Sequence, residues 1–150
     1  MNNMLVEVTV CGRKIKMPPP VYIIPETIQV SEETSTVRGK CIFPSSDPSI
    51  GAREDHANIC HGMFTVWNCA YVLSDRKGWG RLIVVEAHQR AKGIMPPDTE
   101  IDFVASVIKV HEHNKRVTGS AWAEFRFKEK ILLTVHVYEF INEEALHLLR

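Results

Sequence analysis

The sequence predicts an α+β fold in which a curved antiparallel β-sheet wraps around one long central α-helix. The first observation behind this prediction is an apolar stretch from Cys60 to Tyr71, where large side chains recur at the three- and four-residue steps of a helix. The second is the region from Leu82 to Ile141, where apolar and polar residues alternate between short polar turns. A single apolar helix must be covered on most sides, and a curved sheet covers it while burying its own inner face.

The central helix is predicted over about residues 60–74. Its apolar positions at helical spacing share one face and are Cys60, Met63, Phe64, Trp67, Ala70 and Tyr71. Val66 and Cys69 extend this apolar surface, so the helix is expected to be buried. Asn68 interrupts it, and a buried amide costs stability unless it is paired. Asn68 is therefore expected either to bond a neighbouring backbone group or to point into a substrate cavity.

Three polar residues, His56, Asn58 and His61, lie where this helix begins. A helix N-terminus leaves backbone N–H groups unpaired and carries a partial positive charge. Polar residues next to an apolar helix predict a site for a polar head attached to an apolar tail. For Asn58 and for His61, two interpretations stay open. Asn58 either caps the helix or is catalytic, and His61 is either a solvent-exposed residue of the first turn or a general base.

Residues 1–35 are predicted to form an N-terminal hairpin and a proline-rich connector. Alternating residues predict a strand from Leu5 to Val10 that turns into a second strand from Ile15 to Met17. Three consecutive prolines, Pro18 to Pro20, then prevent regular backbone hydrogen bonding. A short strand and a polar reversal are expected over residues 27–35.

Residues 36–142 are predicted to form the core of a single domain that spans residues 1–150. The strands expected in this core are Val37 to Phe43, Leu82 to Ala91, Ile101 to Val110, Val117 to Phe127 and Ile131 to Ile141. The long polar loop Pro44 to Asp55 is expected to be functional or mobile, and Asn142 is expected to cap a short C-terminal helix. Strands, one long helix and then at least four antiparallel strands form the hot-dog fold.

The composition fits one domain and excludes several functions. With 150 residues, 45% of them hydrophobic, the chain can bury one core. Lys plus Arg and Asp plus Glu both total 18 without long blocks of one sign, which argues against a nucleic-acid partner. The absence of a leader segment and of an apolar run of about 18 residues predicts a soluble, unprocessed protein without a membrane span. The four cysteines form no CxxC pair, which favours reduced thiols in a cytoplasmic protein.

Histidine spacing gives no metal site. His111 and His113 lie two residues apart at a predicted strand end, but no third ligand follows at a suitable spacing. No metal and no cofactor are therefore expected. Glu86 and His88 share one face of a strand and are expected to have a structural role, paired with each other, rather than to reach the site.

The segment His56-Ala57-Asn58 leading into Met63 to Tyr71 resembles the loop and helix start of the FcoT-like thioesterases, a hot-dog family that acts on long-chain acyl thioesters. Ala87 to Pro96 resembles the strand and turn that follow this helix in that family. The likeness covers about two thirds of the chain. His61-Gly62 is also similar to a His-Gly pair that many hot-dog enzymes carry at the start of this helix.

The resemblance implies a catalytic role for Asn58, because an asparagine two residues after a loop histidine is catalytic in the family. It also implies that Tyr22 matches a tyrosine ahead of the helix, although the loop Pro44 to Asp55 contains no tyrosine. The acid that hot-dog dehydratases place early in the helix is absent, since Thr65 and Asn68 occupy that neighbourhood. The pattern therefore favours a thioesterase over a plain dehydratase.

Thioester hydrolysis requires a polarised carbonyl, an oriented water and a slot for the acyl chain. Backbone N–H groups near the helix start are candidates for stabilising the oxyanion. Asn58 is predicted to orient the water, with His56 or His61 as the base. The residues predicted to bind substrate are Gly62, Met63, Phe64, Trp67, Asn68 and Tyr22. The alternative for Phe64 and Trp67 is a purely structural place in the core.

The sequence thus favours an acyl thioesterase acting on fatty acyl-CoA or acyl-carrier-protein thioesters. The same groups would also suit a dehydratase, or an enzyme of lipid or polyketide biosynthesis that adds water or an amine at the β-carbon of an enoyl thioester. A non-catalytic acyl-binding or dimerisation domain is the alternative of another class. Hot-dog proteins usually pair their sheets edge to edge with sites between subunits, so a homodimer or a higher homo-oligomer is expected.

Overall fold

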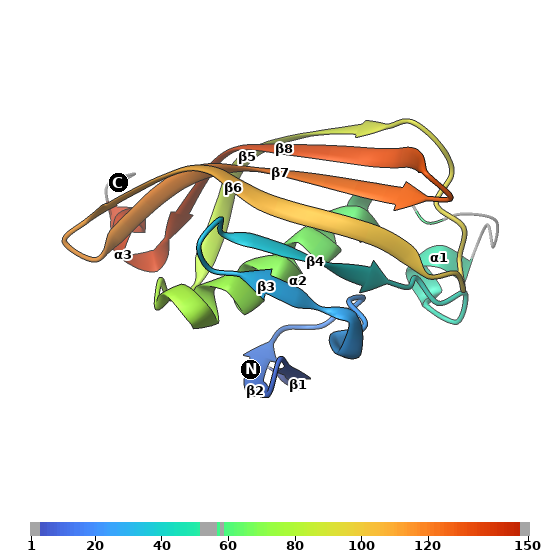
Figure 1. Cartoon of the computed structure of the whole chain (residues 1–150), viewed down its shortest axis with the longest axis horizontal. Coiled ribbons are helices and arrows are strands. Elements are labelled where there is room, and N and C mark those ends of the chain that lie inside the picture. Colours follow the sequence, from blue (N-terminus) through green and yellow to red (C-terminus); the bar gives the residue numbers. More distant parts are fainter. Residues whose placement is uncertain (1–3, 52–56, 58, 148–150) are drawn as a thin grey trace.

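The computed structural model describes residues 4–51, 57 and 59–147. In this part of the chain a six-stranded antiparallel sheet arches over one long helix, and a two-stranded hairpin lies on the other side of that helix (Figure 1). The arrangement confirms the predicted α+β architecture of a curved sheet around a central helix.

The large sheet contains the strands predicted for the core and one short strand before them. Its strands are β3 Gln29–Ser31, β4 Thr36–Cys41, β5 Leu82–Ala91, β6 Ile101–His113, β7 Arg116–Phe127 and β8 Lys130–Asn142. They lie in the order β3-β4-β6-β7-β8-β5, and every neighbouring pair is antiparallel. The strand that follows the helix, β5, therefore crosses to the far edge of the sheet beside β8. The described sheet has β3 and β5 as its two edges.

The central helix, α2, runs from Ile59–Lys77 and is longer at its C-terminal end than predicted. Arg76 and Lys77 occupy its last turn, where positive charge is favourable beside unpaired carbonyl groups. Gly78 ends the helix in the left-handed region, with φ of 67°, and its N–H donates to the Ser74 carbonyl at 2.8 Å.

The side of α2 that packs most tightly differs from the face predicted by residue spacing. Cys60 is exposed, Trp67 is 37% exposed, and Phe64, Ala70 and Tyr71 are only half-buried. Met63, Val66 and Cys69 are buried as predicted, and the other closely packed apolar or small residues of α2 include Gly62, Thr65, Val72 and Leu73. Because α2 is apolar on more than one side, spacing alone could not identify the side that faces the protein interior.

Close approach of α2 to the sheet explains why small residues line the packed side. A Cβ atom added at Gly62 would overlap the Cδ2 atom of Leu133 on β8. Thr65 and Val72, further along the helix, have no exposed surface. The sheet is too near for large aromatic rings at these positions.

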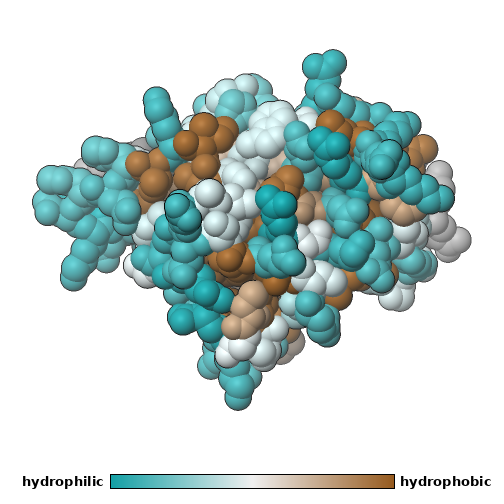
Figure 2. Space-filling view, viewed as in Figure 1, coloured by the Kyte–Doolittle hydropathy of each residue, from teal (hydrophilic) through white to brown (hydrophobic). Residues whose placement is uncertain are grey.

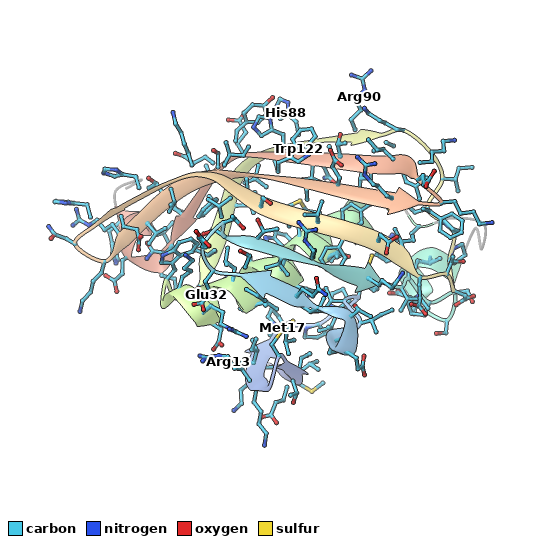
Figure 3. All side chains as sticks on the ribbon, viewed as in Figure 1. Arg13, Met17, Glu32, His88, Arg90 and Trp122 are labelled. Atoms are coloured by element: carbon cyan, nitrogen blue, oxygen red, sulfur yellow. The ribbon has the colours of Figure 1, made fainter. Side chains whose placement is uncertain are left out.

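The N-terminal hairpin covers part of α2 that the sheet does not reach. Its strands are β1 Val6–Val10 and β2 Arg13–Met17, joined by a two-residue turn in which Cys11 and Gly12 both have positive φ. This turn is tighter than predicted, and its conformation suits a two-residue β-hairpin. Arg13 donates to Asp75 of α2 at 2.6 Å, and Met17 is fully buried; Figure 3 labels both hairpin residues beneath α2.

The loop predicted over Pro44 to Asp55 contains a short helix, α1 Pro48–Gly51, and its remaining residues from 52 onward lie outside the described residues. Two hydrogen bonds join its start to the turn after β5. The Ser45 N–H donates to Oδ1 of Asp98 at 2.9 Å, and the Asp98 N–H donates to the Phe43 carbonyl at 2.9 Å. The hydrogen bonds from Ser45 lower the pKa of the Asp98 carboxyl group.

Asn142 caps the C-terminal helix α3 Glu143–Leu146, as predicted. Its Oδ1 accepts the N–H of Ala145 at 3.0 Å and that of Val117 at 3.0 Å, and its Nδ2 donates to the carbonyls of Trp79 and Lys115. This buried amide therefore joins α3, the segment just after α2 and the β6–β7 turn at one end of the sheet. A further helical turn, η1 Pro25–Thr27, precedes β3 in the connector.

Candidate functional site

Tyr22 lies between the end of β4 and the middle of α2. Its N–H donates to Oδ1 of Asn68 at 2.9 Å, and its carbonyl accepts the N–H of Ile42 at 3.0 Å. Its hydroxyl donates to Oδ2 of Asp47 at 2.5 Å. The backbone of Tyr22 is thus held on two sides, and its side chain reaches a carboxylate from a different loop.

Asp47 is a candidate site residue that the sequence interpretation missed. It directly precedes α1, where its N–H donates to the Pro44 carbonyl at 3.0 Å and its carbonyl accepts the N–H of Ile50 at 2.9 Å. Ile50 is 3% exposed and fixes this segment in the core. The first turn of α2 has no acidic residue, so Asp47 supplies a carboxylate from outside the helix. The pair Asp47-Pro48 was a usable signal of a helix start, but it did not indicate proximity to Tyr22.

His61 is 2% exposed, which contradicts the expectation of a first-turn residue open to solvent. The centroid of its ring lies 5.8 Å from that of Tyr22 and 5.9 Å from that of Phe43. These rings enclose it because the connector and the end of β4 pass over the first turn of α2. We call Tyr22, Asp47 and His61 the polar cluster.

Two predicted catalytic residues, His56 and Asn58, lie outside the described residues. Ala57 between them in the sequence is described and is 4% exposed. Its N–H donates to the Met95 carbonyl at 2.8 Å, which joins the chain just before α2 to the segment after β5. The catalytic roles of His56 and Asn58 stay predictions.

Gly62 and Met63 are buried in the first turns of α2. Gly62 is needed for the close contact with Leu133 described above, so it has a packing role, and its predicted role in substrate binding stays a prediction. Asn68 uses its amide for the backbone, because it accepts from Tyr22 and its Nδ2 donates to the Pro20 carbonyl at 3.1 Å. It therefore holds the proline-rich connector against α2.

An apolar groove runs beside α2 next to the edge strand β5. Its helix side is formed by Phe64, Trp67, Tyr71 and also Asn68, which therefore borders the groove as well as bonding the backbone. The prolines 18–20 form a second side, and residues 81–84 form the third. Its volume is about 290 Å³. Ring contacts connect the polar cluster with this groove, since the Phe64 centroid lies 6.4 Å from that of Tyr22 and 5.5 Å from that of Trp67.

Two buried thiols near the site are unsuited to act as nucleophiles. Burial raises the pKa of the Cys41 thiol to about 12, and burial together with the nearby Cys41 raises the pKa of Cys69. Both therefore stay protonated near neutral pH. None of the four cysteines, all of which lie within the described residues, forms a disulfide bond.

The outer face of the sheet carries the predicted Glu86–His88 pair, with Nε2 of His88 3.4 Å from Oε2 of Glu86. Figure 3 shows His88, Arg90 and Trp122 on the side of the sheet opposite α2, away from the polar cluster. Within the described residues no three His, Cys, Asp or Glu side chains are grouped so as to hold a metal ion. No helix in the same part of the chain is long and apolar enough to cross a membrane.

Comparison with protein-family models and with curated proteins finds no match to this sequence. Comparison with solved structures finds similar folds. A thioesterase superfamily protein matches over 77% of this chain with 12% identity and a TM-score of 0.52. A proposed thioesterase from Shewanella oneidensis matches over 75% of this chain and 79% of its own length, with 9% identity and a TM-score of 0.52.

The match spans only 54% of the first of these two proteins. At such low identity the likeness concerns the fold and not the activity. The antiparallel sheet with one long helix described above is the part of the chain's structure that agrees with these neighbours. The chain therefore has the hot-dog fold found in thioesterase superfamily proteins.

Proposed function

We propose that this protein hydrolyses acyl thioesters. The observation that carries the proposal is the position of the polar cluster next to an apolar groove along one helix, with Phe64 in contact with both. A thioester has the same order of groups, because a polar carbonyl is joined to a hydrocarbon chain. The likeness in fold to thioesterase superfamily proteins supports this choice of substrate class.

The start of α2 is suited to polarise the thioester carbonyl. The first N–H groups of a helix have no partner within the helix and carry partial positive charge. Because α2 begins at Ile59, these are the N–H groups of residues up to His61, whereas those of Gly62 and Met63 follow the first turn. The unpaired groups would stabilise the oxyanion that forms when water attacks the carbonyl carbon. The C–S bond then breaks, the acid is released, and the thiolate leaves and takes up a proton.

The polar cluster supplies candidates for the base that accepts the proton of the attacking water. Asp47 is a carboxylate held in place by the Tyr22 hydroxyl, and His61 is an imidazole next to the same ring. The resemblance to the FcoT-like thioesterases adds Asn58 as the residue that orients the water, with His56 beside it. The acid missing from α2 is thus replaced, in this proposal, by Asp47 from the preceding loop.

The substrate is an acyl-CoA or an acyl-carrier-protein thioester, and the active form is a homodimer or a higher homo-oligomer. Support for assembly comes from β5, an edge strand of the described sheet that includes Val85, a residue that is 43% exposed. Pairing of two β5 edges would bring the groove to the boundary between subunits. Four cysteines without disulfide bonds in the described part of the chain support a reducing, cytoplasmic location.

Thiol release from saturated and 2-enoyl acyl-CoA substrates tests the proposal, with products identified by mass. We expect Asp47→Asn, His61→Ala and Asn58→Ala each to lower kcat/KM by about 100-fold or more, the usual contribution of a catalytic acid, base or water-orienting group. His88→Ala on the outer face is the matched control for removal of an imidazole and should leave turnover unchanged.

The product masses separate hydrolysis from the second candidate function. Addition of water to an enoyl thioester without thiol release would favour a lyase, because that reaction also begins with polarisation of the carbonyl. Absence of turnover on every substrate, with acyl chains still bound, would replace the enzyme proposal by an acyl-binding domain. A thermal unfolding curve for each variant shows whether a lost activity reflects a lost fold.

A further inference from the structure

A second apolar space lies inside the fold, between α2 and the concave face of the sheet. It is distinct from the groove and has a volume of about 60 Å³. Its walls include apolar side chains of both layers, among them Val66, Cys69, Leu73, Ala105, Ala121 and Val137. On the face drawn in Figure 2, by contrast, hydrophobic residues appear in separate small areas among hydrophilic ones. The cavity lining, by comparison, is a continuous apolar surface made by α2 and the sheet together.

The chemistry of this cavity fits a hydrocarbon. Its only hydroxyl-bearing side chains are Ser35 and Ser106, and the rest of its lining is apolar. Water enters such a space poorly because it finds too few hydrogen-bond partners. The lining atoms also lack neighbours with which to make dispersion contacts. A methylene chain would fill the space and gain both burial and contact.

Trp67 separates this cavity from the groove. Three residues, Trp67, Leu82 and Val84, line both spaces. Leu82 and Val84 belong to β5 and are fixed in its ladder with Asn142 and Phe140 of β8. Trp67 is the largest of the three, belongs to α2, and is 37% exposed. Substitution of Trp67 by a small residue would therefore remove the largest side chain between the cavity and the groove.

We propose that the internal cavity accepts the terminal carbons of the acyl chain and that Trp67 is the residue that determines chain length. A chain lying in the groove along Phe64 reaches the Trp67 ring, and only a chain that passes this ring enters the cavity. The identity of the ligand as an acyl chain rests on the proposed function. The presence of a hydrocarbon subsite does not require hydrolysis.

Two substitutions change the cavity from opposite sides. Ala121→Leu on β7 fills the cavity without altering the groove, because Ala121 lines the cavity but not the groove. Trp67→Ala joins the cavity with the groove. Trp122→Ala is the matched control for the loss of an indole, since Trp122 is the next residue of β7 and lies on the outer face of the sheet (Figure 3).

The measurement is the dissociation constant for saturated fatty acids of 6 to 18 carbons, together with kcat/KM for the corresponding acyl-CoA series. Each methylene that enters the cavity should tighten binding about fourfold. Ala121→Leu should shorten the preferred chain by about three carbons, the number of carbon atoms it adds, and weaken binding of the longest chains about tenfold or more. Trp67→Ala should shift the preference to longer chains, and Trp122→Ala should leave it unchanged.

The same chain-length profile in wild type, Ala121→Leu and Trp67→Ala would overturn the inference, as would a failure of wild type to bind any fatty acid. Shifted binding profiles without thiol release would uphold the cavity subsite and refute hydrolysis. Strong thiol release with an unchanged chain-length profile would uphold hydrolysis and refute the cavity subsite. If Trp67→Ala fails to fold, Trp67→Leu and the cavity-filling variant give the same comparison.

Discussion

Helix α2 has two apolar sides that the protein uses differently. The packed side, formed by Gly62, Thr65, Val66, Cys69, Val72 and Leu73, is buried under the sheet and its neighbours. The groove side, formed by Phe64, Trp67 and Tyr71, carries aromatic rings that stay partly exposed. Both sides are hydrophobic, but the packed side lies against the sheet except where Val66, Cys69 and Leu73 border the small internal cavity, whereas the groove side is left partly open.

The difference shows that residue size, rather than hydrophobicity, distinguishes core from site on this helix. Small and β-branched residues allow the helix to approach the sheet closely, as the contact of Gly62 with Leu133 shows. Large rings on the opposite side keep β5 and the proline connector at a distance and leave the groove between them. Burial of apolar surface stabilises a protein by about 25 cal/mol per Å², and the exposed part of the groove side lacks this contribution. A ligand or a partner that covered the groove side would recover this free energy.

The largest expected difference in stability is between a charge placed on the packed side of α2 and a charge placed on its groove side. Val72 has no exposed surface, so Val72→Asp buries a carboxylate without a partner and should lower the free energy of unfolding by about 5 kcal/mol or more, enough to unfold many domains. Trp67→Lys should leave the protein folded, because the long side chain can extend through the exposed part of the site to water. Circular dichroism and urea unfolding measure both; equal loss of structure would contradict the distinction between the sides.

Asn68 joins the groove side to the connector, and its removal should have the next largest effect. Asn68→Ala leaves the Tyr22 N–H and the Pro20 carbonyl without their partner in a buried place, which should cost about 2–4 kcal/mol. Urea unfolding gives the value, with Gln29→Ala as a control amide on an exposed position of β3 that should change stability by less than about 0.5 kcal/mol. If Asn68→Ala changed the free energy of unfolding as little as Gln29→Ala, the Asn68 amide would not hold the connector.

A smaller effect tests the close contact on the packed side. Gly62→Ala should destabilise the protein by about 1–3 kcal/mol, because the new methyl group overlaps the Leu133 side chain in a filled core. Leu133→Ala makes room for that methyl group. In a double-mutant cycle the two substitutions together should therefore cost about 1 kcal/mol less than the sum of the single effects. Simple additivity would place the origin of the Gly62 effect elsewhere.

Much of the fold could be predicted because its signals are local. The β5 bounds, the turns of the β6–β7 and β7–β8 hairpins and the Asn142 cap follow from residue alternation and from the chemistry of turns and caps. The packed side of α2 could not be predicted in this way. Periodicity identifies an apolar face only when the opposite face is polar, and here the aromatic residues gave the stronger pattern on the less buried side.

The candidate site was predicted only in part because its contacts join distant segments. His61 was identified from its place at the helix start, but its burial depends on Tyr22 and Phe43, which come from the connector and from beyond β4. Asp47 lies 25 residues from Tyr22 in the sequence, and no local pattern indicates their hydrogen bond. Loop residues of this kind become visible only when the strands that carry the loops are placed.

The reactivity of the cysteines of α2 tests the difference in burial between its two sides without any substitution. Cys60 is exposed whereas Cys69 is buried, although both belong to one helix. Cys60, together with the exposed Cys11, should react rapidly with Ellman's reagent in the native protein at pH 8. Cys41 and Cys69 should react only after denaturation, because burial raises the pKa of both thiols and blocks access to them.

The same raised pKa values predict how stability changes with pH. A thiol in the unfolded chain loses its proton near its ordinary pKa of 9.0, whereas native Cys41 keeps its proton up to about pH 12. The native state therefore binds more protons between these values, so the free energy of unfolding should fall as pH rises above about 9, by about 1 kcal/mol per pH unit for each buried thiol. Urea unfolding at pH 7, 9 and 10 measures this slope, and Cys69→Ala should reduce it, because that variant lacks one of the two buried thiols. An unchanged slope in Cys69→Ala would mean that this position on the packed side of α2 is not buried as described.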